Sequence, residues 1–121
     1  MGDIPSFKIW EDDNYFAFLS IAPIMPGHTL VIPKKHSEYI FDMKDEDLGK
    51  LMVASKPTAA LLKQKLKPKT GKIGVMIAGL EVPHTHIHLI PMDSEGDLTF
   101  ANAKEVSMEN LKSVHDKISN A

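Results

Sequence analysis

The stretch that decides the fold reads Val82-Pro83-His84-Thr85-His86-Ile87-His88-Leu89-Ile90-Pro91, with a histidine at every second position from 84 to 88. Because successive side chains of a β-strand point to opposite faces, a strand here would present all three histidines on one face. Ile87 and Leu89 would then be buried on the other face. Pro91 has no N–H to donate to a neighbouring strand, so we expect the strand to end there. The pattern predicts a strand that is apolar on one side and carries a row of imidazoles on the other.

The rest of the chain predicts further strands and two helices around this stretch. Segments rich in β-branched and aromatic residues predict strands at 7–10, 15–19, 28–32 and 72–78. The short link at 79–81 predicts antiparallel pairing with the histidine strand. Apolar residues at helical spacing predict one helix at 45–67, kinked by Pro57, and a second from the N-cap Ser107 onward. The expected buried helix positions are Leu48, Leu51, Met52, Ala59, Leu62, Leu66, Met108, Leu111, Val114 and Ile118. This mixture predicts an α+β domain with about five mostly antiparallel strands.

Composition excludes several kinds of chemistry. The net charge of −2 gives no overall positive field, so we expect no nucleic-acid partner. All 14 cationic side chains are lysine, and arginine clamps on phosphate are therefore absent from this chain. The chain also has no cysteine, which excludes disulfides, thiolate metal ligands and cysteine nucleophiles.

Length and the absence of targeting signals predict a simple organisation. The 121 residues suit one domain, which we place at 1–121, with 43% hydrophobic and 25% charged residues. No apolar run approaches the length of a membrane span, and residues 1–6 lack the pattern of a signal peptide. We therefore expect a cytoplasmic protein with no membrane partner.

A histidine cluster first suggests a metal site. Neighbouring side chains on one strand face lie roughly 6–7 Å apart, which separates His84 from His88 by roughly 13 Å. Zinc–nitrogen bonds of about 2.0–2.1 Å cannot bring both onto one ion, so at most two of the three histidines share a site. His28 is the obvious further ligand from elsewhere in the chain. A histidine-based metal-binding protein therefore stays open as an interpretation.

Two other interpretations treat the histidines as structural residues or as catalysts. As structural core residues, each buried ring would need hydrogen-bond partners for both nitrogens, which makes three in register a costly arrangement. As catalysts, neutral imidazoles are nucleophiles near physiological pH and can attack phosphorus to form a covalent intermediate. Neighbouring imidazoles would stabilise the phosphate oxygens and assist proton transfer. This chemistry uses no metal ion and no other cofactor, and it is the sharpest interpretation.

At residues 84–90 the sequence resembles the His-φ-His-φ-His-φ-φ signature of the histidine triad (HIT) superfamily, where φ is an apolar residue. Thr85 is a mild departure at the first φ position. Further blocks that resemble bacterial HIT proteins lie at residues 4–12, 16–19, 26–36, 79–84 and 97–102, in the right order along the chain. The resemblance implies a HIT fold with a five-stranded antiparallel sheet and two main helices. It also implies a homodimer in which strands join across a two-fold axis.

The resemblance further implies a nucleotidyl hydrolase or transferase. Such an enzyme cleaves a P–N or P–O bond at the α-phosphate of a nucleotide, and the chain is most similar to the purine nucleoside phosphoramidase branch. His86 matches the nucleophile, and His88 matches the histidine that contacts the phosphate and assists proton transfer. His84 and His28 match the residues that orient this pair. The positions expected to contact the nucleotide are Ser20 near the ribose, Ile21 near the base and ribose, and Glu81 near the phosphate.

Two of these positions depart from the family pattern. Ser20 stands where relatives carry an acidic or amide side chain, and a serine makes fewer bonds to ribose hydroxyls. Glu81 stands where relatives carry a hydroxyl residue, and an ionised Glu81 facing the site would repel phosphate. A non-catalytic nucleotide-binding protein is therefore the second interpretation that stays open, beside the metal-binding one.

Overall fold

A computed structural model describes residues 7–77 and 84–119. It contains a five-stranded antiparallel sheet in the order β1-β2-β3-β5-β4. The strands are β1 (Lys8–Glu11), β2 (Tyr15–Leu19), β3 (Thr29–Pro33), β4 (Lys72–Met76) and β5 (Ile87–Met92). The helices are α1 (Asp45–Leu66) and α2 (Met108–Ser119), and short 3-10 turns occupy Ile40–Asp42, Glu95–Asp97 and Phe100–Asn102. The predicted α+β architecture, with two main helices and a five-stranded antiparallel sheet, is confirmed.

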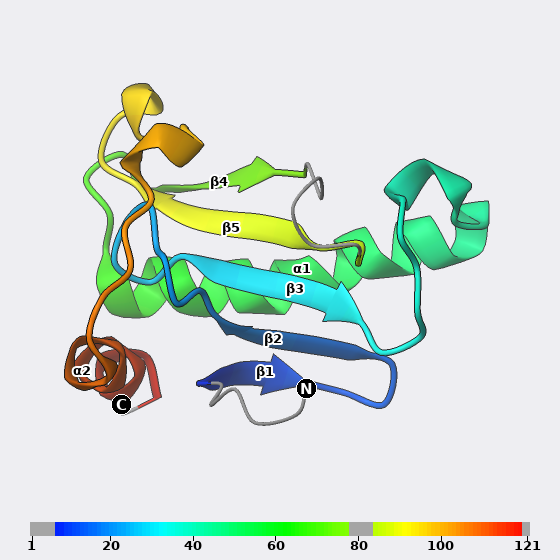
Figure 1. The fold of residues 1–121 in the computed structure, drawn as a ribbon, viewed down its shortest axis with the longest axis horizontal. Helices are drawn as coiled ribbons and strands as arrows, with labels where there is room; N and C mark the ends of the chain where they lie inside the picture. Colours follow the sequence, from blue (N-terminus) through cyan, green and yellow to red (C-terminus); the bar gives the residue numbers. More distant parts are fainter. Residues whose placement is uncertain (1–6, 78–83, 120–121) are drawn as a thin grey trace.

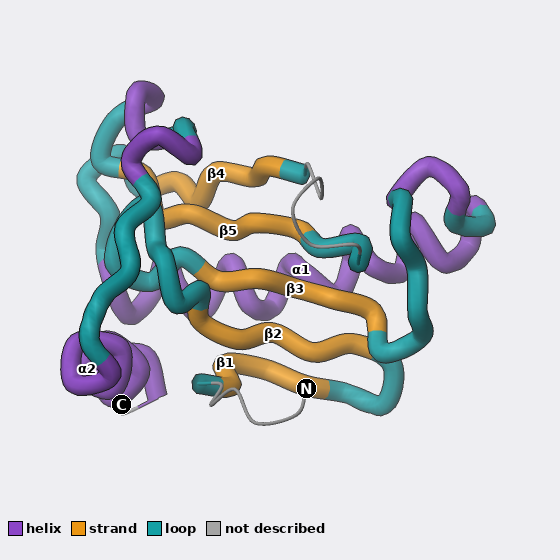
Figure 2. The backbone as a smooth tube through the Cα atoms, in the orientation of Figure 1, coloured by secondary structure: helices purple, strands orange, loops and turns teal. Residues whose placement is uncertain are grey.

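The two helices cover the sheet unequally. Helix α1 lies along one face of the sheet, behind the strands in Figure 1, and α2 packs against α1 and β1 at one end. Figure 2 shows the 3-10 turns at 95–97 and 100–102 together beside the ends of β4 and β5. No helix in the described part of the chain is both long and apolar enough to cross a membrane. Among the described residues, no helix covers the other face of the sheet.

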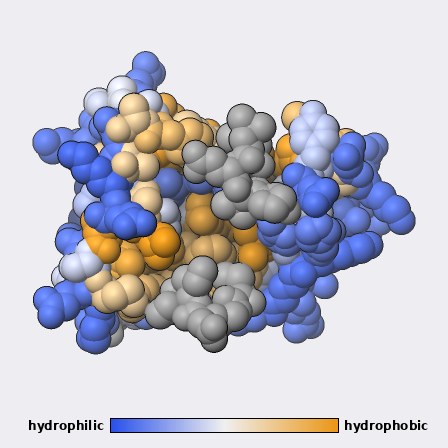
Figure 3. Space-filling model, viewed as in Figure 1, coloured by the Kyte–Doolittle hydropathy of each residue, from blue (hydrophilic) through white to orange (hydrophobic). Residues whose placement is uncertain are grey.

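The core lies between α1 and the covered sheet face. Burial alternates along β2 and β3, as expected for strands with one face in the core, and the buried set includes Ala17 and Val31, which pair with each other. These side chains pack against α1 through Leu51 and Leu62, both 0% exposed. The opposite face carries half-buried apolar residues, namely Phe16, Phe18, Leu30 and Ile32. Figure 3, seen from that side, shows apolar atoms in the middle of the face between polar margins.

The histidine strand differs from its prediction at both ends. Strand β5 begins at Ile87, so His84 and His86 precede it, whereas residues 79–83 of the predicted turn and strand lie outside the described residues. Pro91 does not end the strand but lies within it, opposite Ile73 of β4. Pairing between β5 and β3 stops at Leu89, so no β3 residue is paired opposite Pro91. The missing N–H is tolerated there for that reason.

Helix α1 continues without interruption through Pro57, whose side chain is exposed. The buried positions of α1 are Leu51, Ala54, Ser55, Thr58 and Leu62. Met52 and Met108, predicted as core residues, are instead 43% and 48% exposed. Periodicity thus included the exposed Met52 and missed three buried positions with small or polar side chains, namely Ala54, Ser55 and Thr58.

The predicted start of the second helix is confirmed. The hydroxyl of Ser107 accepts a hydrogen bond from the N–H of Asn110 at 3.1 Å, which satisfies one of the free amides of the first turn. Leu111 and Ile118 are buried as expected. His115, near the end of α2, donates from Nε2 to the carbonyl of Lys8 at 2.8 Å and thereby ties α2 to β1.

Candidate active site

Three histidine side chains come together where β3 and β5 pair. His28 ends the loop before β3, His88 is the second residue of β5, and His86 lies just before that strand. The sheet register places Leu30 opposite His88, which brings His28 within reach of the His88 ring. The ring centroids of His86 and His88 are 4.6 Å apart, and those of His28 and His88 are 5.1 Å apart. All three side chains are buried, with exposed fractions of 8% or less.

The hydrogen bonds of His28 fix the tautomers of two rings. The backbone N–H of Ile24 donates to Nδ1 of His28 at 3.0 Å, so in the neutral ring the proton lies on Nε2. That Nε2–H donates to Nδ1 of His88 at 2.8 Å. His88 therefore carries its own proton on Nε2. No acceptor for this N–H lies among residues 7–77 and 84–119, so it is free to donate to a bound phosphate.

A backbone contact fixes the tautomer of His86. Its Nδ1–H donates to the carbonyl oxygen of His84 at 2.7 Å. In the neutral ring Nε2 then holds a free lone pair, and nothing in the described part of the chain donates to it. The cluster therefore presents an unprotonated Nε2 on His86 beside a protonated Nε2 on His88. One ring thus offers a nitrogen lone pair and its neighbour offers an N–H.

The ring of His84 does not join the other histidines. Its Nε2–H donates to the carbonyl of Pro33 at 3.1 Å, and its ring lies 5.6 Å from that of the exposed His36. The predicted row of three imidazoles on one strand face is therefore wrong. The alternation of side chains holds only inside a strand, and residues 84–86 precede β5. His84 instead reaches His86 through its backbone carbonyl.

Burial holds His28 and His88 in the neutral form. Loss of hydration lowers the pKa of His28 to about 4, with the nearby His86 as a second cause. The same loss of hydration, followed by His86 and His28, lowers the pKa of His88 to about 3. At neutral pH the His88 ring is therefore uncharged, with its proton on Nε2.

These lowered pKa values predict acid sensitivity. Below pH 6.5 the unfolded chain protonates both rings while the folded chain does not, so the unfolded state binds more protons. Stability is then full above pH 6.5 and is lost as the pH falls toward about 4 for His28 and about 3 for His88. We expect the free energy of unfolding to fall by up to about 1.4 kcal/mol per pH unit for each ring.

Urea denaturation at a series of pH values measures this dependence. The matched variant is His88→Asn, because the side-chain oxygen of asparagine can still accept from Nε2–H of His28 but does not titrate. Its slope between pH 6.5 and about 4 should be shallower than that of the wild type. Equal slopes would show that His88 does not carry the effect.

Two contacts of the cluster had no local signal in the sequence. Phe100 lies edge-on to His88, with ring centroids 4.9 Å apart and 46% of the phenylalanine still exposed. The hydroxyls of Ser37 and Thr85 lie 2.8 Å apart, and the Thr85 N–H donates to the Ser37 carbonyl. Phe100 begins a short 3-10 turn and Ser37 lies in a loop, and no periodicity indicates a neighbour for either. Only the fold brings them to the histidines.

The structure places the predicted nucleotide contacts as follows. The N–H of Ser20 donates to the carbonyl of His28 at 2.9 Å, so Ser20 lies beside the histidine cluster. Ile21 follows it with 48% of its surface exposed, and its carbonyl accepts from the N–H of Val106 at 3.3 Å. Glu81 lies outside the described residues.

A cavity of about 480 Å³ also opens at His84, on the sheet face without a helix, and its apolar wall includes Phe16 and Ile32.

The positions of the histidines bear on the metal-binding interpretation. Across 7–77 and 84–119, no three histidine, aspartate or glutamate side chains gather in a way that could hold an ion. The closest nitrogen pair, Nε2 of His28 and Nδ1 of His88, is joined by a hydrogen bond. Binding a metal there would break that bond.

Comparison with known proteins finds relatives of this chain in one domain family. The profile of the HIT domain family matches residues 1–95. The adenosine 5'-monophosphoramidase of Saccharomyces cerevisiae is 36% identical over 121 residues, which span 96% of this chain and 74% of the yeast protein.

Two solved structures are similar over nearly the whole chain. The HIT-like protein of Bartonella henselae involved in cell-cycle regulation has a TM-score of 0.76 at 33% identity, covering 96% of this chain and 86% of its own. A zinc-bound histidine triad family protein of Mycobacterium smegmatis has a TM-score of 0.74 at 26% identity, covering 98% and 87%. The predicted HIT fold is confirmed by these neighbours, and with the family match they show that this chain belongs to the HIT domain family.

Proposed function

We propose that this protein is a nucleoside phosphoramidase or closely related nucleotidyl hydrolase, acting at the α-phosphate of a purine nucleotide through a covalent nucleotidyl-His86 intermediate. The observation that carries the proposal is the pairing of two Nε2 atoms. His86 offers a lone pair, and the adjacent His88 offers an N–H. The name of the yeast relative, an adenosine 5'-monophosphoramidase, supports hydrolysis of a nucleotide P–N bond.

The first step forms the intermediate. The Nε2 lone pair of His86 attacks the α-phosphorus and forms a P–N bond to the imidazole, while the bond from phosphorus to the leaving group breaks. The leaving amine or alkoxide departs with the bonding electrons and takes a proton from solvent. The His86 ring becomes cationic and keeps its Nδ1–H on the His84 carbonyl, which stabilises the new charge.

The second step releases the product. Water attacks the phosphorus, the bond to Nε2 of His86 breaks, and the ring recovers its lone pair while the proton of the water passes to solvent. The products are a nucleoside monophosphate and the free leaving group. In both steps Nε2–H of His88 donates to a phosphate oxygen, and His28 holds the His88 ring in that orientation.

Ser20 and Ile21 are proposed to contact the ribose and base, because they adjoin His28 and Ile21 is half exposed. The homodimer implied by the family resemblance is also a proposal. Strand β4 pairs only with β5 among the described strands, and Val75 on it is 46% exposed. A second copy joining there would cover this edge and its apolar surface.

Trapping the intermediate tests the proposal. The chain is mixed with adenosine 5'-phosphoramidate and quenched in alkali, because phosphorus–histidine bonds survive base and hydrolyse in acid. Intact-mass spectrometry should show one adenylate per chain during turnover, and peptide mapping should place it on His86. A His115→Gln variant, changed at a histidine far from the cluster, should give the same adduct.

The two alternative functions predict other outcomes. A non-catalytic nucleotide-binding protein would bind the nucleoside monophosphate without turnover or adduct. A zinc-dependent protein, suggested by the zinc-bound relative from Mycobacterium smegmatis, would lose its activity when a chelator is added. We expect the chelator to change neither adduct nor turnover. Turnover with no adduct on His86 would contradict the proposed mechanism.

A further inference from the structure

Phe100 covers part of the histidine cluster, and the proposed mechanism gives it no role. Its ring lies edge-on to that of His88, with the centroids 4.9 Å apart and an angle of 69° between the ring planes. Phe100 is 46% exposed, whereas His88 is only 8% exposed. This large apolar side chain therefore shields a histidine and lies outside the core between α1 and the sheet.

The sheet register explains why the His88 ring needs such a cover. His88 is paired with Leu30 of β3. Directly paired residues project from the same face of a sheet, and Leu30 lies on the face that no described helix covers. The His88 ring therefore lies on that face as well, and a loop has to exclude water from it. Phe100 supplies an apolar ring at this place.

The segment that carries Phe100 is attached to the sheet on one side and to the loop before β3 on the other. Leu98 packs directly on the backbone of β4 at Gly74, where an added Cβ would lie only 2.6 Å from Cδ2 of Leu98. The N–H of Lys104 donates to the carbonyl of Pro23 at 3.4 Å. Phe100 lies between these two attachments in the sequence, so its backbone is held close to the histidine cluster.

Side chains that bond to nearby backbone groups also hold the chain around Phe100. Oδ2 of Asp97 accepts from the N–H of Asp93 at 2.7 Å. The hydroxyl of Thr99 accepts from the N–H of Ala101 at 3.2 Å. Such bonds are typical of tight turns and restrict the backbone. The Phe100 ring is therefore held in place against His88 by its own segment.

We propose that Phe100 is a positioning residue for the reaction proposed above, because its ring holds the His88 ring in place and keeps water from it. The inference rests on the proposed function, in which Nε2–H of His88 donates to a phosphate oxygen. His28 holds the His88 ring through a hydrogen bond at Nδ1, and the aromatic contact restrains the same ring further. Where water is excluded, the hydrogen bond to phosphate is stronger. Phe100 thus acts through His88 and not on the substrate itself.

The protonation of His88 reports whether Phe100 keeps water from it. Loss of hydration is the largest cause of the low pKa of His88, about 3, and the other titratable groups that act on the ring are His86 and His28. Phe100→Ala should admit water, which favours the charged form of the ring. We expect the pKa of His88 to rise by at least about one unit in this variant.

NMR titration of the isotope-labelled full chain from pH 7 to pH 5 measures this change. The Cε1–H signal of His88 is identified by its absence in His88→Asn. In the wild type this signal should stay constant down to pH 5, because the ring remains neutral. In Phe100→Ala it should begin to move by pH 5. Phe100→Gln, which keeps much of the size but brings a polar group, should move the signal in the same direction.

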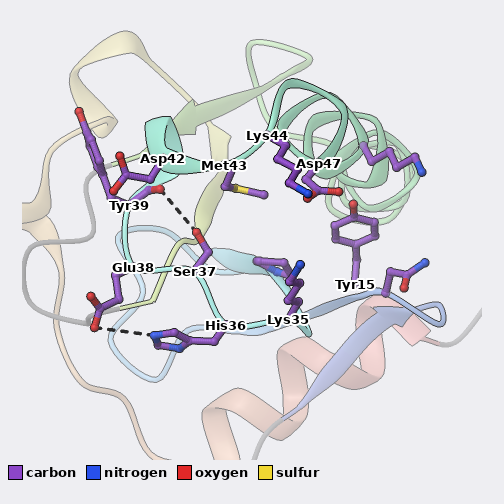
Figure 4. A pocket seen from close by; sticks show the side chains of 13 residues that line it. Tyr15, Lys35, His36, Ser37, Glu38, Tyr39, Asp42, Met43, Lys44 and Asp47 are labelled. Carbon is purple, nitrogen blue, oxygen red and sulfur yellow. Dashed lines mark hydrogen bonds and ion pairs between the residues drawn. The ribbon is translucent and has the colours of Figure 1, made fainter.

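Two further variants serve as controls. Phe100→Leu keeps an apolar group against His88 and should behave like the wild type. Phe41→Ala removes a ring that is 73% exposed and packs edge-on against Tyr39, which lines a cavity beside the start of α1 (Figure 4). None of His28, His86 and His88 lines that cavity, so this variant should leave the His88 signal unchanged. Backbone amide spectra report whether each variant keeps the fold.

Turnover of adenosine 5'-phosphoramidate gives the second measurement. Phe100→Ala should lower kcat by about tenfold with little change in KM, because the affected hydrogen bond stabilises the reacting phosphate. Phe100→Leu should recover most of this loss, and Phe41→Ala should turn over like the wild type.

Three results would overturn the proposal. The first is a His88 signal that stays constant to pH 5 in folded Phe100→Ala or Phe100→Gln, as in the wild type. The second is an unchanged kcat in Phe100→Ala. The third is a Phe100→Leu variant that behaves like Phe100→Ala, because an apolar cover would then not be what His88 needs. The titration uses no substrate, so a wild type without phosphoramidase activity would contradict the proposed function separately from the contact between Phe100 and His88.

Discussion

We expect replacement of His86 with asparagine to lower kcat/KM for adenosine 5'-phosphoramidate by at least about 10⁴-fold, which corresponds to about 5 kcal/mol of lost transition-state stabilisation. The asparagine amide group can still donate to the His84 carbonyl, as Nδ1–H of His86 does. The variant should therefore keep the local hydrogen bond, but it lacks the imidazole nitrogen that is proposed to attack phosphorus. The expected loss would come from removal of the proposed nucleophile and not from local unfolding.

Two measurements separate catalysis from binding in this variant. Its affinity for the nucleoside monophosphate should change little, because the contacts proposed for the ribose and base lie at Ser20 and Ile21. The His115→Gln variant should keep full turnover. If His86→Asn retained turnover within a factor of about ten, another group would be the nucleophile and the covalent mechanism would be wrong.

We expect replacement of Gly27 with alanine to destabilise the fold by about 3 kcal/mol. Gly27 has a φ of +92°, a conformation that costs residues with a Cβ about 1–2 kcal/mol. The added Cβ would also collide with the Leu66 side chain and lie 3.3 Å from Cγ of Pro91. Overpacking of this kind costs about 1–3 kcal/mol. Gly27 thus allows the close approach of the loop before His28 to the end of α1 and to β5.

Gly49→Ala is the matched control for this substitution. Gly49 lies inside α1, and a Cβ added there meets nothing within 4 Å. Because alanine favours helix over glycine, this variant should gain about 0.5–1 kcal/mol. Urea denaturation compares both variants with the wild type. An unchanged urea midpoint for Gly27→Ala would show that the loop relaxes and that the added Cβ does not destabilise the fold. Gly27→Ala should also reduce turnover, because the next residue is His28.

Local pattern determined most of the secondary structure. Alternation in β2 and β3, the acidic first turn of α1 and the Ser107 cap all follow from side chains within a few residues of one another. The histidine spacing and the surrounding blocks also identified the family, since a motif at fixed spacing needs no tertiary information. Patterns of this kind say little about the ends of elements. The sequence accordingly placed His86 inside a strand that begins one residue later, and it ended at Pro91 a strand that continues to Met92.

Only the tertiary structure decided which histidine side chains meet. The bond between His28 and His88 joins residues 60 positions apart, and it fixes which nitrogen of His88 carries the proton. Two other features also depend on segments that are far apart in the sequence. They are the bond of the His84 ring to Pro33 and the contact of Phe100 with His88. Sequence by itself determined that the histidines are present and in what spacing. Which of them meet, and with which nitrogen free, was set by sheet register and burial, because both arise only when β3 and β5 pair and exclude water.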